Sequence, residues 1–272
     1  MTASPFARLE RLPQAASTNT VLRDAAAAEP DRWPHLSAVL AEHQTAGRGR
    51  AGRGWVTPPG AALTASLLLR PHVPPERAAW LTLLSGLAVV RAVRALAPAS
   101  TSAVGLKWPN DVLVPDAGPE LAGWGTARKL GGILTELLPT TTGRPAAVVG
   151  IGLNLSQDHS ELPVASATSL ALAGLPVPPA EELLVAVGRE LGDLVTRWEA
   201  SGGDPRAAGL LDEVSEVCLS IGRAVRVERP AAAPLLGTAE EIDDGGGLVV
   251  RDPGGERHRV LAGDVLHVRR QA

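Results

Sequence analysis

The pattern of apolar segments changes near residue 220, and this change constrains the fold more than any other feature of the chain. Before it, apolar segments long enough for strands or helices alternate along the sequence. After it, short valine-rich segments alternate with turn-forming pairs such as Asp244-Gly245 and Pro253-Gly254. Five short strands within about 50 residues are typical of a small β-barrel. We therefore predict two domains, residues 1–218 and residues 219–272.

The segments before residue 220 predict both strands and helices. The predicted strands are 37–41, 62–69, 104–108, 111–114, 131–138 and 146–155. One helix is predicted to begin after Ser17-Thr18-Asn19 and to continue through Ala28, and others to span 80–96, 179–200 and 205–217. We expect residues 1–14 to form a short leader and the Pro/Gly-rich segment 115–128 to form a mobile surface loop.

The composition excludes several classes of protein. The 272 residues carry a net charge of -3, which gives no basic field for nucleic acid. Cys218 is the single cysteine, so no intrachain disulfide can form and a reducing compartment fits. No run of about 18 apolar residues is present, and the N-terminus lacks the basic and apolar regions of a signal peptide. We expect a cytoplasmic protein without a membrane partner.

Lysine and asparagine are scarce in this chain, which is rich in alanine and arginine. The 26 lysines and arginines include only two lysines, Lys107 and Lys129, and the only asparagines are Asn19, Asn110 and Asn154. Drift toward GC-rich codons produces such usage, because it replaces lysine by arginine. Chance survival could explain any one of the five. All five lie in the short motifs described below, however, which indicates that their chemistry is required.

The segment Gly47-Arg48-Gly49-Arg50-Ala51-Gly52-Arg53-Gly54-Trp55 concentrates glycine and arginine. Glycine lets the backbone approach a ligand closely, and the arginine fork suits carboxylates and phosphates. The segment follows a predicted strand and Gln44, inside a folded domain. This position favours an anion-binding loop, unstructured when empty, over a solvated or RNA-binding arginine-glycine loop.

Two further segments place a lysine beside polar groups or glycines. In Lys107-Trp108-Pro109-Asn110-Asp111, Lys107 could contact a phosphate and Asp111 could hold Mg²⁺, which prefers carboxylate and water oxygens. The alternative is a polar hairpin turn. In Lys129-Leu130-Gly131-Gly132, the glycines would permit backbone contact with a flat ligand and the lysine supplies a compact charge. The alternative is an exposed lysine at the start of a strand.

The segment Gly150-Ile151-Gly152-Leu153-Asn154 contains part of a dinucleotide-binding fingerprint. The third glycine is missing, because position 155 is Leu155, and no GxxxxGK[ST] string exists in the chain. Neither a Rossmann site nor a Walker P-loop is therefore expected. Any nucleotide must be held by other means.

Taken together, these segments resemble the biotin protein ligase family. The GRGRxGRxW loop, the KWPND turn, the KLGGIL strand entry and the GIGLN strand occur in that family's order. Ser17-Thr18-Asn19 and Gln44 match its first biotin-contact segments, and the similarity spans about residues 14–270. The resemblance implies an α+β fold, with a mixed β-sheet catalytic domain, helices packed on one face, and a small C-terminal SH3-like β-barrel.

The resemblance also implies a role for each motif residue. The biotin-binding residues would be Ser17, Thr18, Asn19, Gln44, Arg48, Gly49, Arg50, Lys129, Gly131 and Gly132. The ATP- and adenylate-binding residues would be Arg50, Arg53, Trp55, Lys107, Asn110, Asp111, Lys129 and Asn154. Lys129, Arg48 and Arg50 would be catalytic, and Asp111 would hold Mg²⁺.

The implied activity has two steps, with ATP and biotin as substrates and Mg²⁺ as the metal. Biotin would react with ATP to give biotinyl-5'-AMP and pyrophosphate. Biotin would then pass to a lysine of the biotin carboxyl carrier protein domain of a biotin-dependent carboxylase. Lysine, arginine and Mg²⁺ would offset the repulsion between the biotin carboxylate and the α-phosphate. A glycine-rich lid would protect the adenylate from water.

Two features depart from the family pattern. Only about 14 residues precede the first motif, so we expect no N-terminal helix-turn-helix domain and no DNA partner. We also expect a monomer or weak homodimer. Segment 115–128 is longer than the usual link between the two lysine motifs.

One alternative function is that of a lipoate–protein ligase of the same fold group, against which the GRGRAGR loop argues. Another is a non-enzymatic nucleic-acid-binding protein, against which the net charge argues.

Overall fold

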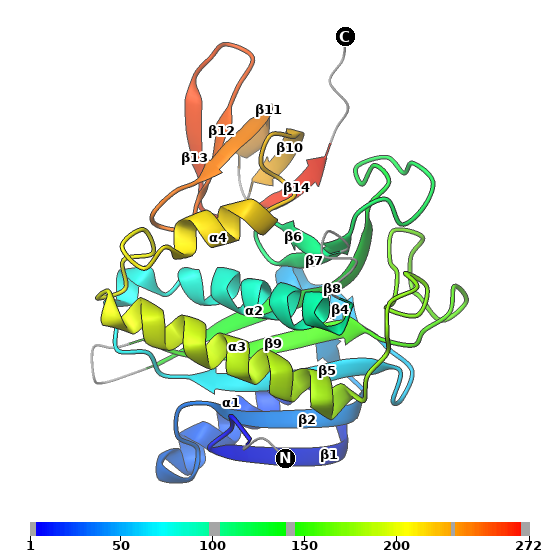
Figure 1. Cartoon of the computed structure of the whole chain (residues 1–272), viewed down its shortest axis with the longest axis vertical. Coiled ribbons are helices and arrows are strands. Elements are labelled where there is room, and N and C mark those ends of the chain that lie inside the picture. The colour runs from blue at the N-terminus through cyan, green and yellow to red at the C-terminus, as the bar shows by residue number, and fades with distance from the viewer. Residues whose placement is uncertain (1–3, 98–103, 140–144, 230–231, 268–272) are drawn as a thin grey trace.

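A seven-stranded sheet forms the centre of the larger part of the molecule (Figure 1). This computed structural model describes residues 4–97, 104–139, 145–229 and 232–267. In spatial order the strands are β1 (Arg8–Ala15), β2 (Ser37–Gln44), β5 (Ala62–Leu69), β9 (Ala146–Asn154), β8 (Arg128–Leu138), β7 (Asp111–Val114) and β6 (Gly105–Lys107). Neighbouring strands are antiparallel except β1 and β2, which are parallel. The expected mixed sheet is therefore confirmed.

The prediction that residues 1–14 form a leader is wrong. Its second half, from Arg8 onward, belongs to β1, which pairs with β2 from Arg8 opposite Ser37 to Ala15 opposite Gln44. Along β1 most side chains are exposed or half-buried. An edge strand pairs with a neighbouring strand along one edge only and is less covered by the core, so it tolerates such charged and polar side chains. The alternation of apolar residues in β1 was consequently too weak to identify it.

Helices cover both faces of the central sheet. The α-helices are α1 (Thr18–Ala28), α2 (Trp80–Leu96), α3 (Ala180–Ala200) and α4 (Leu210–Val217). Helices α2 and α3 lie on one face and share its buried core with Val149 of β9 (Figure 1). Helix α1 lies on the other face, where Leu22 packs in a second core with Val148. The two valines point to opposite faces because side chains alternate along a strand. The helices expected on one face are present, and α1 is an additional helix on the other.

The C-terminal residues form a separate antiparallel sheet of five strands. In spatial order they are β13 (Arg257–Val260), β12 (Leu248–Arg251), β11 (Ala232–Ile242), β10 (Ala224–Arg229) and β14 (Asp264–His267). This sheet is consistent with the expected SH3-like fold, although its edge strands β13 and β14 do not pair with each other among the described residues. The predicted domain boundary after residue 218 falls between α4 and β10 and stays a prediction.

Two buried tryptophans fix the C-terminal sheet against the larger part. The indole nitrogen of Trp80 donates to the carbonyl oxygen of Asp244 at 2.8 Å, and that of Trp108 donates to Gly246 at 3.0 Å. Both acceptors lie in the turn between β11 and β12. Because buried indole N–H groups require a partner, these bonds select one placement of the two sheets.

The remaining elements are short. They are the 3₁₀ helices Pro30–Arg32, Arg50–Gly52 and Pro75–Arg77 and the strands β3 (Gly47–Arg48) and β4 (Gly54–Trp55). No helix in the described ranges combines the length and apolar character needed to cross a membrane.

Candidate active site

One cavity of about 610 Å³ brings almost all of the predicted site residues together. It lies on the same face of the sheet as α1, over the part that α1 does not cover. Residues of the C-terminal sheet also line it. The predicted residues at its wall are Ser17, Thr18, Asn19, Gln44, Arg48, Gly49, Arg50, Arg53, Trp55, Lys107, Asn110, Asp111, Lys129, Gly132 and Asn154. Segments that are far apart in the sequence therefore share one site.

Gly131 is the predicted residue that does not line this cavity. A side chain at Gly131 would overlap the carbonyl oxygen of Gly152 on the neighbouring strand. Close packing of the two strands therefore explains why position 131 is glycine, and its predicted contact with biotin stays a prediction.

At one end of the cavity, Gln44 caps the first helix. Its side-chain oxygen accepts hydrogen bonds from the backbone nitrogen of Thr18 at 2.7 Å and from the Thr18 hydroxyl at 3.1 Å. Ser17 occupies the N-cap position, but its side chain makes no capping hydrogen bond. A residue on β2, remote in sequence, thus supplies the cap that the sequence assigned to the local polar residues.

Asn19 is held from three sides at the same end. Its amide nitrogen donates to Glu136 Oε2 at 2.6 Å and to the Leu134 carbonyl at 3.2 Å. Its amide oxygen accepts from the Ser66 hydroxyl at 2.6 Å. Asn19 is buried, so these bonds fix its rotamer and amide orientation. The result is a rigid, hydrogen-bonding wall.

The glycine- and arginine-rich segment forms a hairpin rather than an irregular loop. Gly47 pairs with Trp55 and Arg48 with Gly54, and the turn between them has Ala51 at φ 54° and Gly52 at φ 73°. Left-handed backbone at two consecutive positions suits glycine and a small residue. The predicted mobility of this segment stays a prediction.

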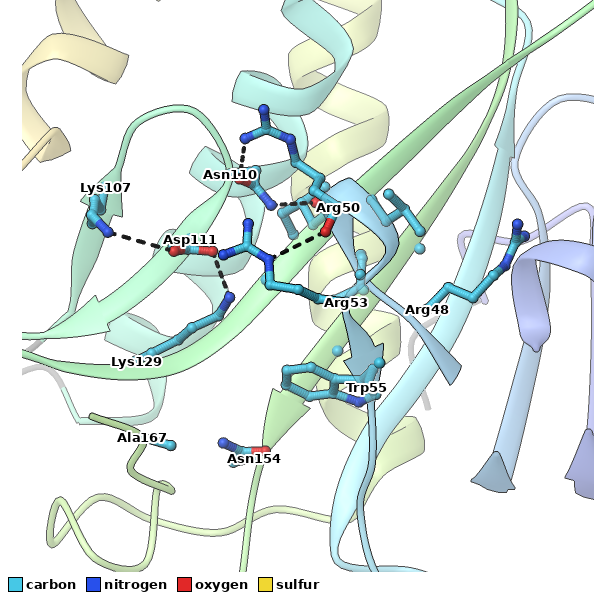
Figure 2. A pocket seen from close by; sticks show the side chains of 18 of the residues that line it. Arg48, Arg50, Arg53, Trp55, Lys107, Asn110, Asp111, Lys129, Asn154 and Ala167 are labelled. Atoms are coloured by element: carbon cyan, nitrogen blue, oxygen red, sulfur yellow. Dashed lines mark hydrogen bonds and ion pairs between the residues drawn. The ribbon is translucent and has the colours of Figure 1, made fainter. Parts of the chain in front are cut away.

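The three arginines of the hairpin extend to three different parts of the site (Figure 2). Arg48 pairs with Glu136 at 3.0 Å, and Arg53 pairs with Asp264 of β14 at 2.9 Å. Arg50 donates to the side-chain oxygen of Asn110 at 2.8 Å. The hairpin therefore links the α1 end, the β6–β7 turn and the C-terminal sheet.

Two lysines flank one carboxylate at the second end of the cavity (Figure 2). Lys129 Nζ lies 2.7 Å from Asp111 Oδ1, and Lys107 Nζ lies 3.9 Å from Asp111 Oδ2. Burial lowers the pKa of Lys107, Asp111 raises it, and the nearby Lys129 charge lowers it again. The pair of cations lies where an anionic ligand would receive two positive charges, from β6 and β8 on either side of β7.

An aromatic ring and an amide lie beside this cationic group. A side chain at Gly152 would come within 2.6 Å of the Trp55 ring, so the indole lies against the bare backbone of β9. Trp55 Nε1 is buried without a hydrogen-bond partner in the part of the chain that is described. Asn154 donates to the Thr168 carbonyl at 2.9 Å and accepts from Gln157 at 3.0 Å. The amide is thus fixed by segment 157–168.

Several residues of the site were not identified from the sequence. Glu136 follows a recognised motif, but nothing local indicates that it pairs with Arg48 and Asn19. Asp264 and Trp124 line the cavity from the C-terminal sheet and from segment 115–128. Their contacts are between distant residues, so only the folded chain reveals them.

Comparison with known proteins agrees with this architecture. The sequence model of the Biotin/lipoate A/B protein ligase family matches residues 12–155. The model of the Biotin protein ligase C terminal domain matches residues 220–268.

Individual relatives cover nearly the whole chain. It is 37% identical over 269 residues to a biotin–[acetyl-CoA-carboxylase] ligase of Mycobacterium tuberculosis, covering 98% of this chain and 91% of that protein. It is 32% identical over 224 residues to the ligase of that name from Paracoccus denitrificans, covering 80% and 85%. The biotin protein ligase of Aquifex aeolicus in complex with biotin and ATP shares the fold, with a TM-score of 0.72 at 23% identity over 97% of this chain and 100% of that one.

The fold and the gathering of the motif residues in one cavity define a protein ligase of the biotin or lipoate type. With the family match and the near full-length relatives, the chain belongs to the Biotin/lipoate A/B protein ligase family, and within it to the biotin protein ligases. The relatives do not favour the lipoate–protein ligase alternative. The hairpin arginines contact cavity residues, which gives no support to a nucleic-acid-binding loop.

Proposed function

We propose that this enzyme binds biotin at the α1 end of the cavity and ATP at the lysine end. The observation that carries this proposal is the contrast between the two ends. One end presents the fixed amide and hydroxyl groups of Asn19 and the Gln44-capped helix, with the charges of Arg48 and Glu136 paired, whereas the other presents Lys107, Lys129 and the Trp55 ring. The two ends match a neutral ureido ring on one side and a triphosphate with a flat base on the other.

The α1 end suits the ureido ring of biotin because that ring carries one carbonyl and two N–H groups without charge. Ser17, Thr18, Asn19 and Gln44 supply hydroxyl and amide groups at the cavity wall. Bonds among Thr18, Asn19, Gln44 and Ser66 fix them before a ligand arrives. Preorganised polar groups lose little conformational entropy on binding.

The adenine base is assigned to the space beside Trp55. Base–aromatic stacking requires an exposed ring face with a fixed orientation. The Trp55 ring is fixed from behind by the Gly152 backbone, and Asn154 lies at the same wall. This arrangement would place the α-phosphate toward Lys129.

In the first reaction step, a biotin carboxylate oxygen forms a bond with the α-phosphorus. The bond from that phosphorus to the bridging oxygen breaks, and pyrophosphate leaves with the electron pair. Both reactants are anions, so Lys129, Arg48 and Arg50 would offset their repulsion and stabilise the charge of the transition state. These are the roles that we assign to the three residues.

In the second step, the amine of the carrier lysine attacks the acyl carbon of the adenylate. The bond from carbon to the phosphate oxygen breaks, AMP leaves, and the new amide nitrogen loses a proton. Positioning drives this step, because the mixed anhydride is already reactive. We propose that the acceptor is the carrier domain of a biotin-dependent carboxylase in the cytoplasm.

Asp111 and Asn110 offer oxygen donors where Mg²⁺ could bind. Asp111 lies between the two lysines, and the Asp264 carboxylate also lines the cavity. Mg²⁺ is commonly held by one or two carboxylates together with substrate phosphates, which fits this donor set. When bound, the ion would neutralise phosphate charge and assist departure of pyrophosphate.

The proposal is tested by measuring pyrophosphate release from ATP with biotin, with lipoate, and with neither. We expect release with biotin only, followed by biotinylation when a biotin carrier domain is added. Equal release with lipoate, or release with biotin but no transfer to any carrier domain, would contradict the proposal.

A further inference from the structure

Trp124 provides one face of the environment of Lys107. The Lys107 ammonium is 4.2 Å from the centre of the Trp124 ring, which is within the range of a cation–π contact. Its carboxylate neighbour Asp111 is 3.9 Å away, too far for a hydrogen bond, and no other described residue accepts one from this ammonium. Lys107 is 6% exposed. Its position therefore depends strongly on the indole.

Segment 115–128, which carries this indole, is fixed at two places. The backbone nitrogen of His267 on β14 donates to the Gly123 carbonyl at 3.2 Å, so the C-terminal sheet supports the residue before Trp124. Buried Arg128 donates to the carbonyls of Pro119, Gly125 and Ala127 and closes the base of the segment. The segment that carries the ring is consequently bonded to the C-terminal sheet at Gly123 and to the start of β8 at Arg128.

The ring also separates two cavities. Trp124 lines both the active-site cavity and a second cavity of about 600 Å³ between segment 115–128 and the C-terminal sheet. A smaller side chain would open the Lys107 ammonium to that second space. The lysine could then leave the active-site wall, because its four-carbon stem is flexible.

We propose that Trp124 is a positioning residue that holds the Lys107 ammonium toward the triphosphate of ATP. This inference rests on the proposed function, because it takes ATP as the ligand of the lysine end. It gives segment 115–128 a role in nucleotide binding. It also predicts that the π face, rather than the bulk of the side chain, is what matters.

The test compares Trp124→Phe, which keeps a ring face, with Trp124→Leu, which keeps apolar volume without one. We expect Trp124→Leu to raise KM for ATP by roughly 3- to 20-fold with biotin affinity unchanged, and Trp124→Phe to stay within about twofold. In a Lys107→Met background, Trp124→Leu should have no further effect, because the cation is already absent. Leu121→Ala, in the same segment but on the second cavity, is the control and should leave KM for ATP unchanged.

The outcomes separate this inference from the proposed function. If the unsubstituted protein releases no pyrophosphate with biotin, the proposed function fails. If it does, but Trp124→Leu equals Trp124→Phe or has the same effect without Lys107, Trp124 is a packing residue only. Thermal unfolding of each variant shows whether it is folded, and Trp124→Met replaces Trp124→Leu if the latter does not fold.

Discussion

Gly150 and Gly152 of the GIGLN strand should control the two ligands separately. The two residues lie two positions apart on β9, so their missing side chains face the same way, into the cavity. An added Cβ at Gly152 would lie 2.6 Å and 2.8 Å from two carbons of the Trp55 ring. An added Cβ at Gly150 would overlap the Asn19 side-chain oxygen and lie 3.1 Å from Cγ of Asn19. One glycine serves the proposed adenine site and the other the proposed biotin site.

The size of each effect follows from what must move. Carbon atoms in contact are about 3.5–4.0 Å apart, so Gly152→Ala must displace the Trp55 ring by about 1 Å. The strand cannot yield easily, because Gly152 pairs with Thr64 on one side and Gly132 on the other. Base stacking is worth about 1–3 kcal/mol, and its loss should raise KM for ATP by roughly 5- to 150-fold.

Gly150→Ala acts on a side chain that cannot move freely. Asn19 would have to break bonds to Glu136, Leu134 or Ser66 to accept the new methyl group. Displacing Asn19 from the cavity wall would remove its proposed hydrogen bonding to biotin, and the loss of one such bond, worth about 0.5–1.5 kcal/mol, should raise the dissociation constant for biotin by roughly 2- to 13-fold.

The assay measures KM for ATP from pyrophosphate release at saturating biotin and biotin affinity by calorimetry, for both variants. Each variant is the matched control of the other, because each adds one methyl group to the same face of the same strand. Thermal unfolding checks that both remain folded. If both variants weaken both ligands equally, or if Gly152→Ala affects biotin alone, the division of the cavity into two ends is refuted.

Three further predictions concern Lys129, the hairpin and His267. Lys129→Arg should slow ATP–pyrophosphate exchange on the order of a hundredfold, because a planar fork cannot replace a compact ammonium; near-normal exchange would remove Lys129 from catalysis. Segment 47–54 should gain amide-exchange protection with biotinyl-adenylate, and Arg50→Ala should speed adenylate release; equal protection and an unchanged off-rate would show a static hairpin. Burial lowers the pKa of His267 from 6.5 to about 4, so unfolding free energy should decline as pH falls through this window, by at most about 3 kcal/mol. Chemical denaturation of His267→Gln should show a weaker decline, and an equal decline would assign the effect elsewhere.

Local sequence predicts the long apolar elements of this fold accurately. Segments 62–69 and 80–96 coincide with β5 and α2, because continuous burial leaves a strong apolar pattern. Strand β1 escapes prediction because it is an edge strand whose burial is partial. Its place in the sheet comes from parallel pairing with β2, a contact between residues about 29 positions apart.

The motifs predict the composition of the site better than its contacts. Fifteen of the site residues that the motifs predict meet in one cavity. The cap on Thr18 and the partner of Arg53 come instead from Gln44 and Asp264, which no local pattern connects to them. Such pairings join residues that are distant in sequence, so they cannot be predicted from the local sequence around either residue.

Charge balance across the cavity explains how so many cations can share one site. Arg48, Arg53 and Lys129 each pair with a carboxylate, and these carboxylates belong to β8, β14 and β7. Without them the cations would repel one another across the cavity. Among the described residues, Arg50 differs from these three, because its acceptors are the neutral oxygens of Asn110 and Gly263.

This difference assigns a distinct role to Arg50 in ligand binding. An anion that approaches Arg48, Arg53 or Lys129 must compete with a carboxylate already in contact, which reduces the net gain in free energy. An anion that approaches Arg50 exchanges only neutral acceptors for a charged one, and so adds an attraction between opposite charges that the present bonds lack. Arg50 therefore has the most to gain from the adenylate phosphate among the hairpin arginines. That is why its substitution should affect retention of the adenylate more than substitution of Arg48 or Arg53 does.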